Sequence, residues 1–151
     1  MKTQELILIQ TDNRLRKLAK ISDSIPPQGW IYTIRTALGM SLRQLGNIAS
    51  ITPQGVKDIE VREKNGNITI AALEQMGQAL NMRLVYGFVP KEGTLQKKID
   101  KQALAVAKKI VTRTSNNMAL EDQKVNAAML KKSITAKAQE IKQKNLKSLW
   151  E

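Results

Sequence analysis

The sequence predicts a mainly all-α protein with a helix-turn-helix, one short β-strand and a C-terminal helical hairpin. Apolar residues recur at every third or fourth position over most of the 151 residues, which is the period of amphipathic helices. One segment, residues 82–90, alternates instead with the two-residue period of a strand. We therefore divide the chain into an N-terminal helical arm (1–29), a helix-turn-helix domain (30–81), a dimerising strand (82–90) and a C-terminal helical extension (91–151).

The arm is predicted to be one helix that ends in a proline-containing turn. Its apolar side comprises Leu6, Ile9, Leu15, Leu18 and Ile21 within the helix expected from Lys2 to Ser22. Residues 26–29, Pro-Pro-Gln-Gly, form the turn. The next helix is expected to start at Trp30 and to close at Gly39. We expect Trp30 to pack where the arm meets the domain; insertion of this aromatic at a nucleic-acid surface is the alternative.

Residues 41–64 have the pattern of two short helices joined by a tight turn. The apolar stripe of the first helix comprises Leu42, Leu45, Ile48 and Ala49, with Ser41 as its cap. Residues 50–52 break the pattern, and Thr52 caps a second helix that has Pro53 at its first position. Val56 and Ile59 continue the buried stripe, which leaves six residues facing outward: Gln54, Gly55, Lys57, Asp58, Val61 and Arg62. This layout places a helix in the DNA major groove; an ordinary helical hairpin with a solvated polar face is the alternative.

The residues of this outward face have the chemistry to read base edges. The Gln54 amide can bond adenine, Lys57 can donate to guanine, and Asp58 can accept from cytosine or orient a neighbour. Gly55 is expected to let the helix backbone approach the bases closely. The residues that we expect to contact phosphates are Arg43, Thr52, Arg62 and Lys64. The loop after Lys64 is equally well interpreted as a phosphate contact or as a solvated turn.

After a helix from Thr69 to Leu80, the alternating segment predicts a strand that needs a partner. A lone strand leaves its backbone N–H and C=O groups unpaired, and the chain offers no second convincing strand. Pairing with the same strand of a second copy would satisfy these backbone groups, so we predict a homodimer. The dimerising residues are expected to be Leu84, Val85, Tyr86 and Phe88. An extended segment packed on its own domain is the alternative.

The C-terminal extension is predicted to be a helical hairpin. Its first helix ends at a polar break, residues 114–117, and its second runs from about Leu120, with Trp150 as an anchor near the chain end. The net charge of the chain is +12, and residues 91–151 carry fourteen Lys and Arg against six Asp and Glu. Such an excess favours an anionic partner. A solvated lysine face is the leading interpretation for most of these residues.

Composition argues against several classes of protein. The chain has no histidine and no cysteine, so His-based catalysis, His- or Cys-ligated metals and disulfides are unavailable. Its eight glycines form no dinucleotide-binding or P-loop motif. We therefore expect no enzyme, no cofactor and no metal site. Because neither an apolar stretch of membrane-spanning length nor a signal peptide is recognisable, we expect a soluble, cytoplasmic protein.

Two resemblances sharpen these expectations. Residues 31–80 resemble the Cro/C1-type repressor domain, in the pattern Leu42, Leu45, Gly46 and in a third helix ending at Ile59 and Glu60. Two residues depart from that family's pattern: Gly46 replaces the usual alanine, and Leu42 replaces a glutamine that commonly contacts the DNA backbone.

Nearly the whole chain resembles the mobile mystery protein A family. The motifs concerned comprise Pro27, Gly29, Trp30 and Ile31; residues 83–90; Met118, Leu120, Glu121 and Gln123; and Leu149 with Trp150. This resemblance implies a companion protein with a Fic domain. It also implies the role of an autorepressor or antitoxin-like regulator. The two-fold axis of the predicted homodimer, in turn, demands a pseudo-palindromic operator in double-stranded DNA. The alternative is a protein-interaction module whose helical tail binds a partner without specific DNA binding.

Overall fold

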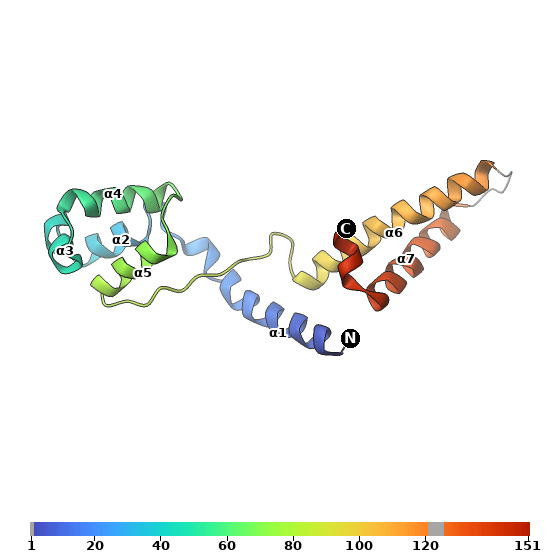
Figure 1. Ribbon diagram of the computed structural model, residues 1–151, viewed down its shortest axis with the longest axis horizontal. Helices are drawn as coiled ribbons and strands as arrows, with labels where there is room; N and C mark the ends of the chain where they lie inside the picture. The colour runs from blue at the N-terminus through green and yellow to red at the C-terminus, as the bar shows by residue number, and fades with distance from the viewer. Residues whose placement is uncertain (1, 121–125) are drawn as a thin grey trace. The chain divides into compact units, whose positions relative to one another are not determined.

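The computed structural model describes residues 2–120 and 126–151, and it confirms a mainly all-α chain (Figure 1). Its helices in chain order are α1 (Lys2–Ala19), η1 (Ser22–Ser24), α2 (Trp30–Ala37), α3 (Leu42–Ala49), α4 (Pro53–Lys64), α5 (Ile70–Ala79), α6 (Leu95–Leu120), α7 (Ala127–Lys144) and η2 (Leu146–Trp150). The described residues form two compact units. The first comprises residues 18–88; the second comprises residues 2–17 with 89–120 and 126–151.

The first unit is built around one small apolar core contributed by α2, α3, α4 and α5. Leu45, Val56 and Met76 are fully buried at its centre, and Ile31 and Leu80 pack around them. Each of the last three helices begins with a side-chain cap. The side-chain hydroxyl oxygens of three residues accept the first free backbone N–H groups: Ser41, Thr52 and Thr69. Ser41 forms a full capping box with Gln44.

The turn between α3 and α4 depends on a glycine. Ser50 adopts a left-handed conformation (φ 57°), and the Ile51 N–H donates to the Gly46 carbonyl at 2.9 Å. A Cβ at Gly46 would lie only 2.7 Å from the Ile51 carbonyl oxygen. The absence of a side chain at this position therefore allows the turn to fold back onto α3.

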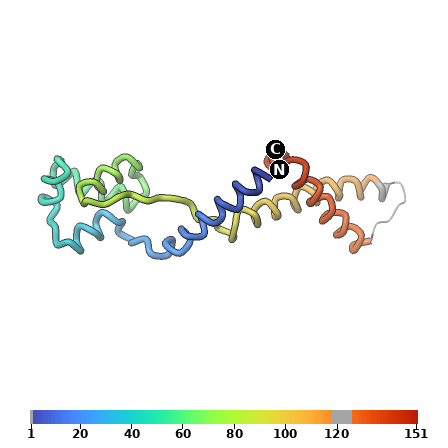
Figure 2. Tube along the Cα trace, turned by 90° about the horizontal axis from the view of Figure 1, so that it is seen from below, coloured from blue at the N-terminus to red at the C-terminus, as the bar shows by residue number. Residues whose placement is uncertain are grey.

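The second unit is an α6–α7 hairpin whose helices run side by side (Figure 2). Small residues line the contact: Ala103, Ala107 and Ala138 are buried, and Leu149 of η2 closes the end of this core. The Lys142 ammonium bonds Asp100 at 2.8 Å across the two helices. At the start of α6, the Asp12 carboxylate of α1 accepts the Leu95 N–H at 2.8 Å. None of the helices described is long and apolar enough to cross a membrane.

Four expectations are wrong in detail. The polar residues 114–117 do not interrupt α6, because they include no proline or glycine and the Thr114 hydroxyl bonds back to the Ile110 carbonyl at 3.1 Å. The second hairpin helix begins at Ala127, capped by Asn126, rather than near Leu120. Ile48 is 53% exposed, outside the buried stripe. Trp150 is 53% exposed, and the buried anchor at the chain end is Leu149. The expected packing of Trp30, which is 43% exposed, stays a prediction.

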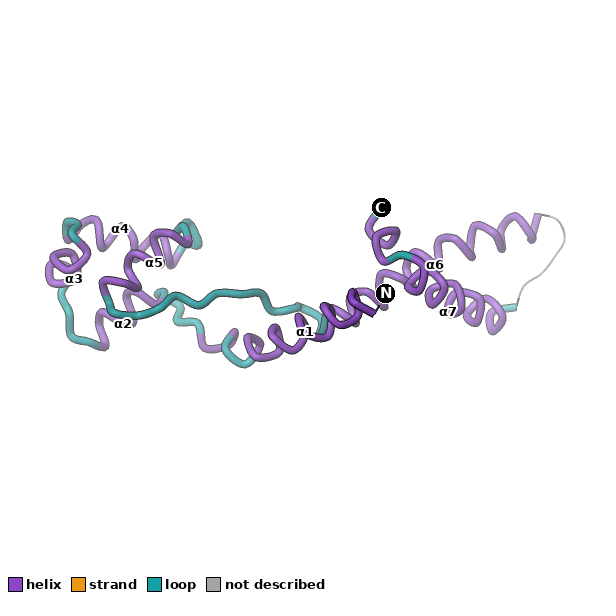
Figure 3. Tube along the Cα trace, turned by 60° about the horizontal axis from the view of Figure 1, so that its bottom comes forward, coloured by secondary structure: helices purple, strands orange, loops and turns teal. Residues whose placement is uncertain are grey.

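Residues 82–90 form no strand within the described single chain, where they appear as a loop between α5 and α6 (Figure 3). Val85, Tyr86 and Phe88 are exposed, whereas Leu84 is half-buried. A strand requires hydrogen bonds to a neighbouring strand. The predicted pairing with a second copy therefore stays a prediction.

Candidate nucleic-acid interface

Helix α4 has two chemically different faces. Val56, Ile59 and Glu60 are buried against the rest of the first unit. The opposite side carries the outer row of α4, which consists of Gln54, Lys57, Asp58, Val61 and Arg62 and is exposed along its length. These positions follow one another at spacings of three and one, which places them on one side of a helix. The row therefore offers amide, ammonium, carboxylate and guanidinium groups to a partner.

A buried ion pair fixes the inner side of α4. The Arg35 guanidinium on α2 bonds both carboxylate oxygens of Glu60, at 2.6 and 3.2 Å, and donates to the Met40 carbonyl at 2.8 Å. The two side chains are only 10% and 3% exposed. The hydrogen bond to Glu60 outweighs desolvation and raises the pKa of Arg35. Because both partners are shielded and mutually paired, the pair fixes how α4 lies against α2.

Glu63 makes a second connection, from the end of α4 to the start of α2. Its carboxylate accepts the backbone N–H of Trp30 at 2.7 Å and of Ile31 at 2.9 Å. Helix α2 has Gly29 as its N-cap and therefore no cap from its own side chains. Glu63 takes over that role, placing negative charge at the positive end of the helix. A Cβ at Gly29 would lie 2.8 Å from the Glu63 Cδ, so the glycine makes room for this contact.

Within the outer row, Gln54 and Asp58 are hydrogen-bonded to each other. Gln54 Nε2 donates to Asp58 Oδ1 at 2.8 Å. Of the two roles expected for Asp58, orienting a neighbour is the one that this contact serves. The second Nε2 hydrogen and the Oε1 atom of Gln54 remain to face a partner.

Two of the predicted residues serve the helix itself. Thr52 Oγ1 accepts the Gly55 N–H at 2.9 Å and so caps α4. Gly55 is half-buried, and its expected close approach to base edges stays a prediction. A Cβ there would lie 3.2 Å from Thr52 Oγ1 and 3.6 Å from the Ile51 Cβ, because side chains in the first turn of a helix tilt back toward its N-terminus.

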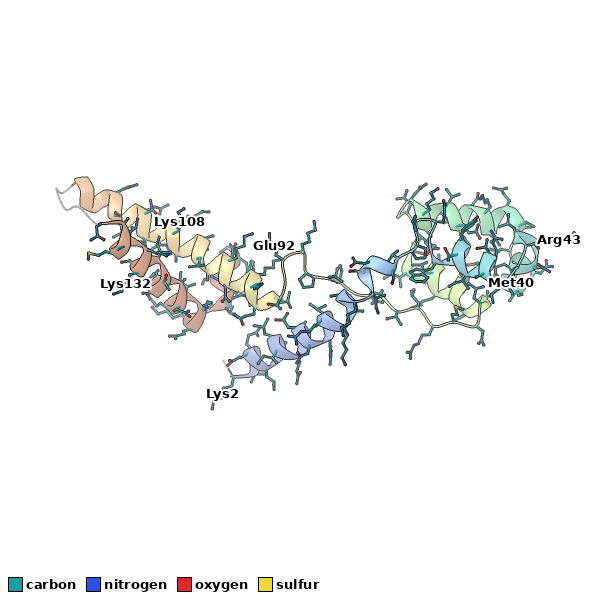
Figure 4. All side chains as sticks on the ribbon, turned by 180° about the vertical axis from the view of Figure 1, so that it is seen from behind. Lys2, Met40, Arg43, Glu92, Lys108 and Lys132 are labelled. Atoms are coloured by element: carbon teal, nitrogen blue, oxygen red, sulfur yellow. The ribbon has the colours of Figure 1, made fainter. Side chains whose placement is uncertain are left out.

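The remaining predicted residues are basic and exposed. Arg43 projects from the first turn of α3 (Figure 4). Arg62 and Lys64 lie in the last turn of α4. Within residues 2–120 and 126–151, none of these three side chains forms an ion pair. Their charges are therefore available to an anionic partner.

Sequence reasoning missed the residues that position α4: Arg35, Glu60 and Glu63. A signal was present for Glu60, which follows Val56 and Ile59 at the spacing of the buried stripe. A carboxylate on a buried face calls for a cation, and Arg35 lies at the corresponding place on the stripe of Ile31 and Ile34. No comparable signal marks Glu63, because its partners are backbone amides.

The described residues contain no group of three His, Cys, Asp or Glu side chains that could hold a metal ion. Comparisons of the chain with family profiles, curated proteins and solved structures found no match.

Proposed function

We propose that the chain is a sequence-specific DNA-binding transcriptional regulator that reads the major groove with α4. One observation carries the proposal. The outer row of α4 is exposed and contains no apolar residue except Val61, while the inner side is fixed by Val56, Ile59 and the Arg35–Glu60 pair. A rigid helix with a polar, base-compatible outer side is what insertion between two phosphate backbones requires.

The dimensions of α4 suit this role. Twelve residues at about 1.5 Å each give a rod of about 18 Å. The major groove, about 12 Å wide, admits a helix of ordinary diameter. In the proposed complex, the Gln54 amide bonds N7 and N6 of an adenine while Asp58 holds the other Nε2 hydrogen. Lys57, one position before Asp58, donates to a guanine.

Phosphate contacts are assigned to the basic residues around this row. Arg43 and Arg62 supply guanidinium groups, and Lys64 supplies an ammonium group in the last turn of α4. The Thr52 hydroxyl keeps its hydrogen for a phosphate oxygen while its lone pair caps the helix. These contacts position α4 but do not discriminate between sequences.

The regulatory part of the proposal follows from the resemblance described above. Two copies of the chain would place two α4 helices on a pseudo-palindromic operator with half-sites about 34 Å apart. An operator upstream of the chain's own gene makes the protein an autorepressor. The Fic-domain companion is the proposed partner for the antitoxin-like role.

The test is a titration of two duplexes, one selected by the protein from a random library and one scrambled. Gln54→Ala should weaken binding to the selected duplex by about 1–3 kcal/mol and leave the scrambled duplex unchanged. Gln75→Ala removes the same side chain from an exposed position on α5 and serves as the matched control. Equal effects of the two variants, or equal losses of Gln54→Ala on both duplexes, would refute the proposal.

A second candidate function is supported by α1. The helix buries none of its residues, and Leu6, Ile7 and Ile9 are each at least half exposed. Exposed apolar side chains can contribute to a protein-binding surface. A protein-interaction module would bind its partner through this helix and show no difference between the two duplexes.

A further inference from the structure

The segment between α5 and α6 carries backbone groups that the described chain leaves unpaired. The Met82 N–H still donates to the Gly77 carbonyl at 2.7 Å, which closes the end of α5. From Arg83 to Val89, no backbone group bonds another backbone group within residues 2–120 and 126–151. These groups can form a ladder with an added strand.

One side of this segment lies against Leu18. A Cβ at Gly87 would overlap the Leu18 Cδ1, so the Gly87 side lies against the end of α1. In extended backbone, neighbouring side chains point to opposite sides. Tyr86 and Phe88 accordingly face away from Leu18 and are 68% and 82% exposed; Val85, on the side of Gly87, is also 65% exposed.

We propose that two copies of the chain pair through this segment as antiparallel strands, with Tyr86 on the two-fold axis. In this register Tyr86 lies opposite Tyr86 of the second copy, and Leu84 lies opposite Phe88. Val85 lies opposite Gly87, on the side of the segment against which Leu18 packs. The segment is thus complementary to itself, which is the condition for a two-fold interface.

Pro90 agrees with this register. Antiparallel pairs alternate between positions whose N–H groups point into the ladder and positions whose N–H groups point out of it. With Arg83, Val85, Gly87 and Val89 bonded to the second copy, Pro90 falls on an outward position. Its missing N–H therefore costs the ladder nothing.

The pairing would bring two α4 helices into one particle that binds DNA. Only this contribution to DNA binding rests on the proposed function. The pairing is tested without DNA. A failed cross-link and a failed duplex titration are therefore separate results.

The test uses disulfide cross-linking, because the chain has no cysteine of its own. In Tyr86→Cys, the two introduced thiols meet across the axis at a Cα separation of about 4.5 Å, which a disulfide spans. In Val85→Cys, the matched control, the two thiols are diagonal neighbours about 7–8 Å apart, which is too far. An equal mixture of Leu84→Cys and Phe88→Cys places the two thiols opposite each other and keeps Tyr86.

Under mild oxidation, the Tyr86→Cys protein should shift to twice the mass of the chain. The equal mixture of Leu84→Cys and Phe88→Cys should shift in the same way. Val85→Cys, and Phe88→Cys alone, should stay at the mass of the single chain. Sedimentation equilibrium of the unsubstituted protein should give a dimer that dissociates on dilution. Cross-linking of Val85→Cys at the rate of Tyr86→Cys would overturn the register, and a monomer at every concentration would overturn the pairing.

Discussion

Replacing Glu60 by glutamine should destabilise the first unit strongly. The substitution keeps the size of the side chain but leaves the Arg35 guanidinium buried, 10% exposed, without its counter-charge. Loss of one partner of a buried ion pair costs about 3–5 kcal/mol. Because small domains have about 5–15 kcal/mol of stability in total, the variant should lose a large share of it.

The matched control is Glu74→Gln on α5, which changes the net charge equally at an exposed position. Unfolding of the first unit is followed in urea by Trp30 fluorescence, in a Trp150→Phe background so that only this unit reports. The double variant Arg35→Met with Glu60→Leu removes both charges and should recover most of the loss. A Glu60→Gln loss below about 1 kcal/mol relative to Glu74→Gln would refute the reasoning, since that is the range of an exposed pair.

Four further results are expected. Glu63→Ala should destabilise the first unit by about 0.5–2 kcal/mol in the same urea assay, because it removes the cap of α2; an unchanged midpoint would contradict that role. Gly46→Ala should also destabilise it, since about 1–3 kcal/mol of overpacking against the Ile51 carbonyl exceeds the gain of about 1 kcal/mol in helix propensity; a higher midpoint would contradict this. Arg43→Ala should weaken both duplexes alike and reduce the salt slope of binding by about one unit; a loss confined to one duplex would assign it to base reading. The hairpin should lose stability as the pH falls from 4.5 to about 2, because hydrogen bonds from Lys144 and Lys137 lower the pKa of Glu140 to about 2 and the unfolded chain binds the proton first. Trp150 fluorescence in a Trp30→Phe background measures the unfolding of the hairpin at each pH. Glu140→Gln should make hairpin stability less dependent on pH over this range.

Local signals explain why the sequence predicted α3 and α4 well. Ser41, Thr52 and Pro53 are capping residues whose chemistry acts within one turn, and both helices begin where these residues indicate. The outer row was predicted because it follows from helical spacing alone.

The contacts that sequence reasoning missed join residues far apart in the chain. Arg35 and Glu60 are 25 positions apart, and the Glu63 contacts reach 32 and 33 positions back. The continuity of α6 was missed for another reason. Polar residues were interpreted as a break, although without proline or glycine they can stay helical when a stripe such as Ala103 and Ala107 packs against α7.

The central claim is that the outer row of α4 contacts base edges. Amide chemical shifts in the isotope-labelled protein, followed while the duplex upstream of its own gene is added, test it most directly. The signals of Gln54, Lys57 and Asp58 should move with saturable binding, while those of α7, such as Thr135, should stay in place. Unmoved signals along the outer row, with or without changes elsewhere, would contradict the account.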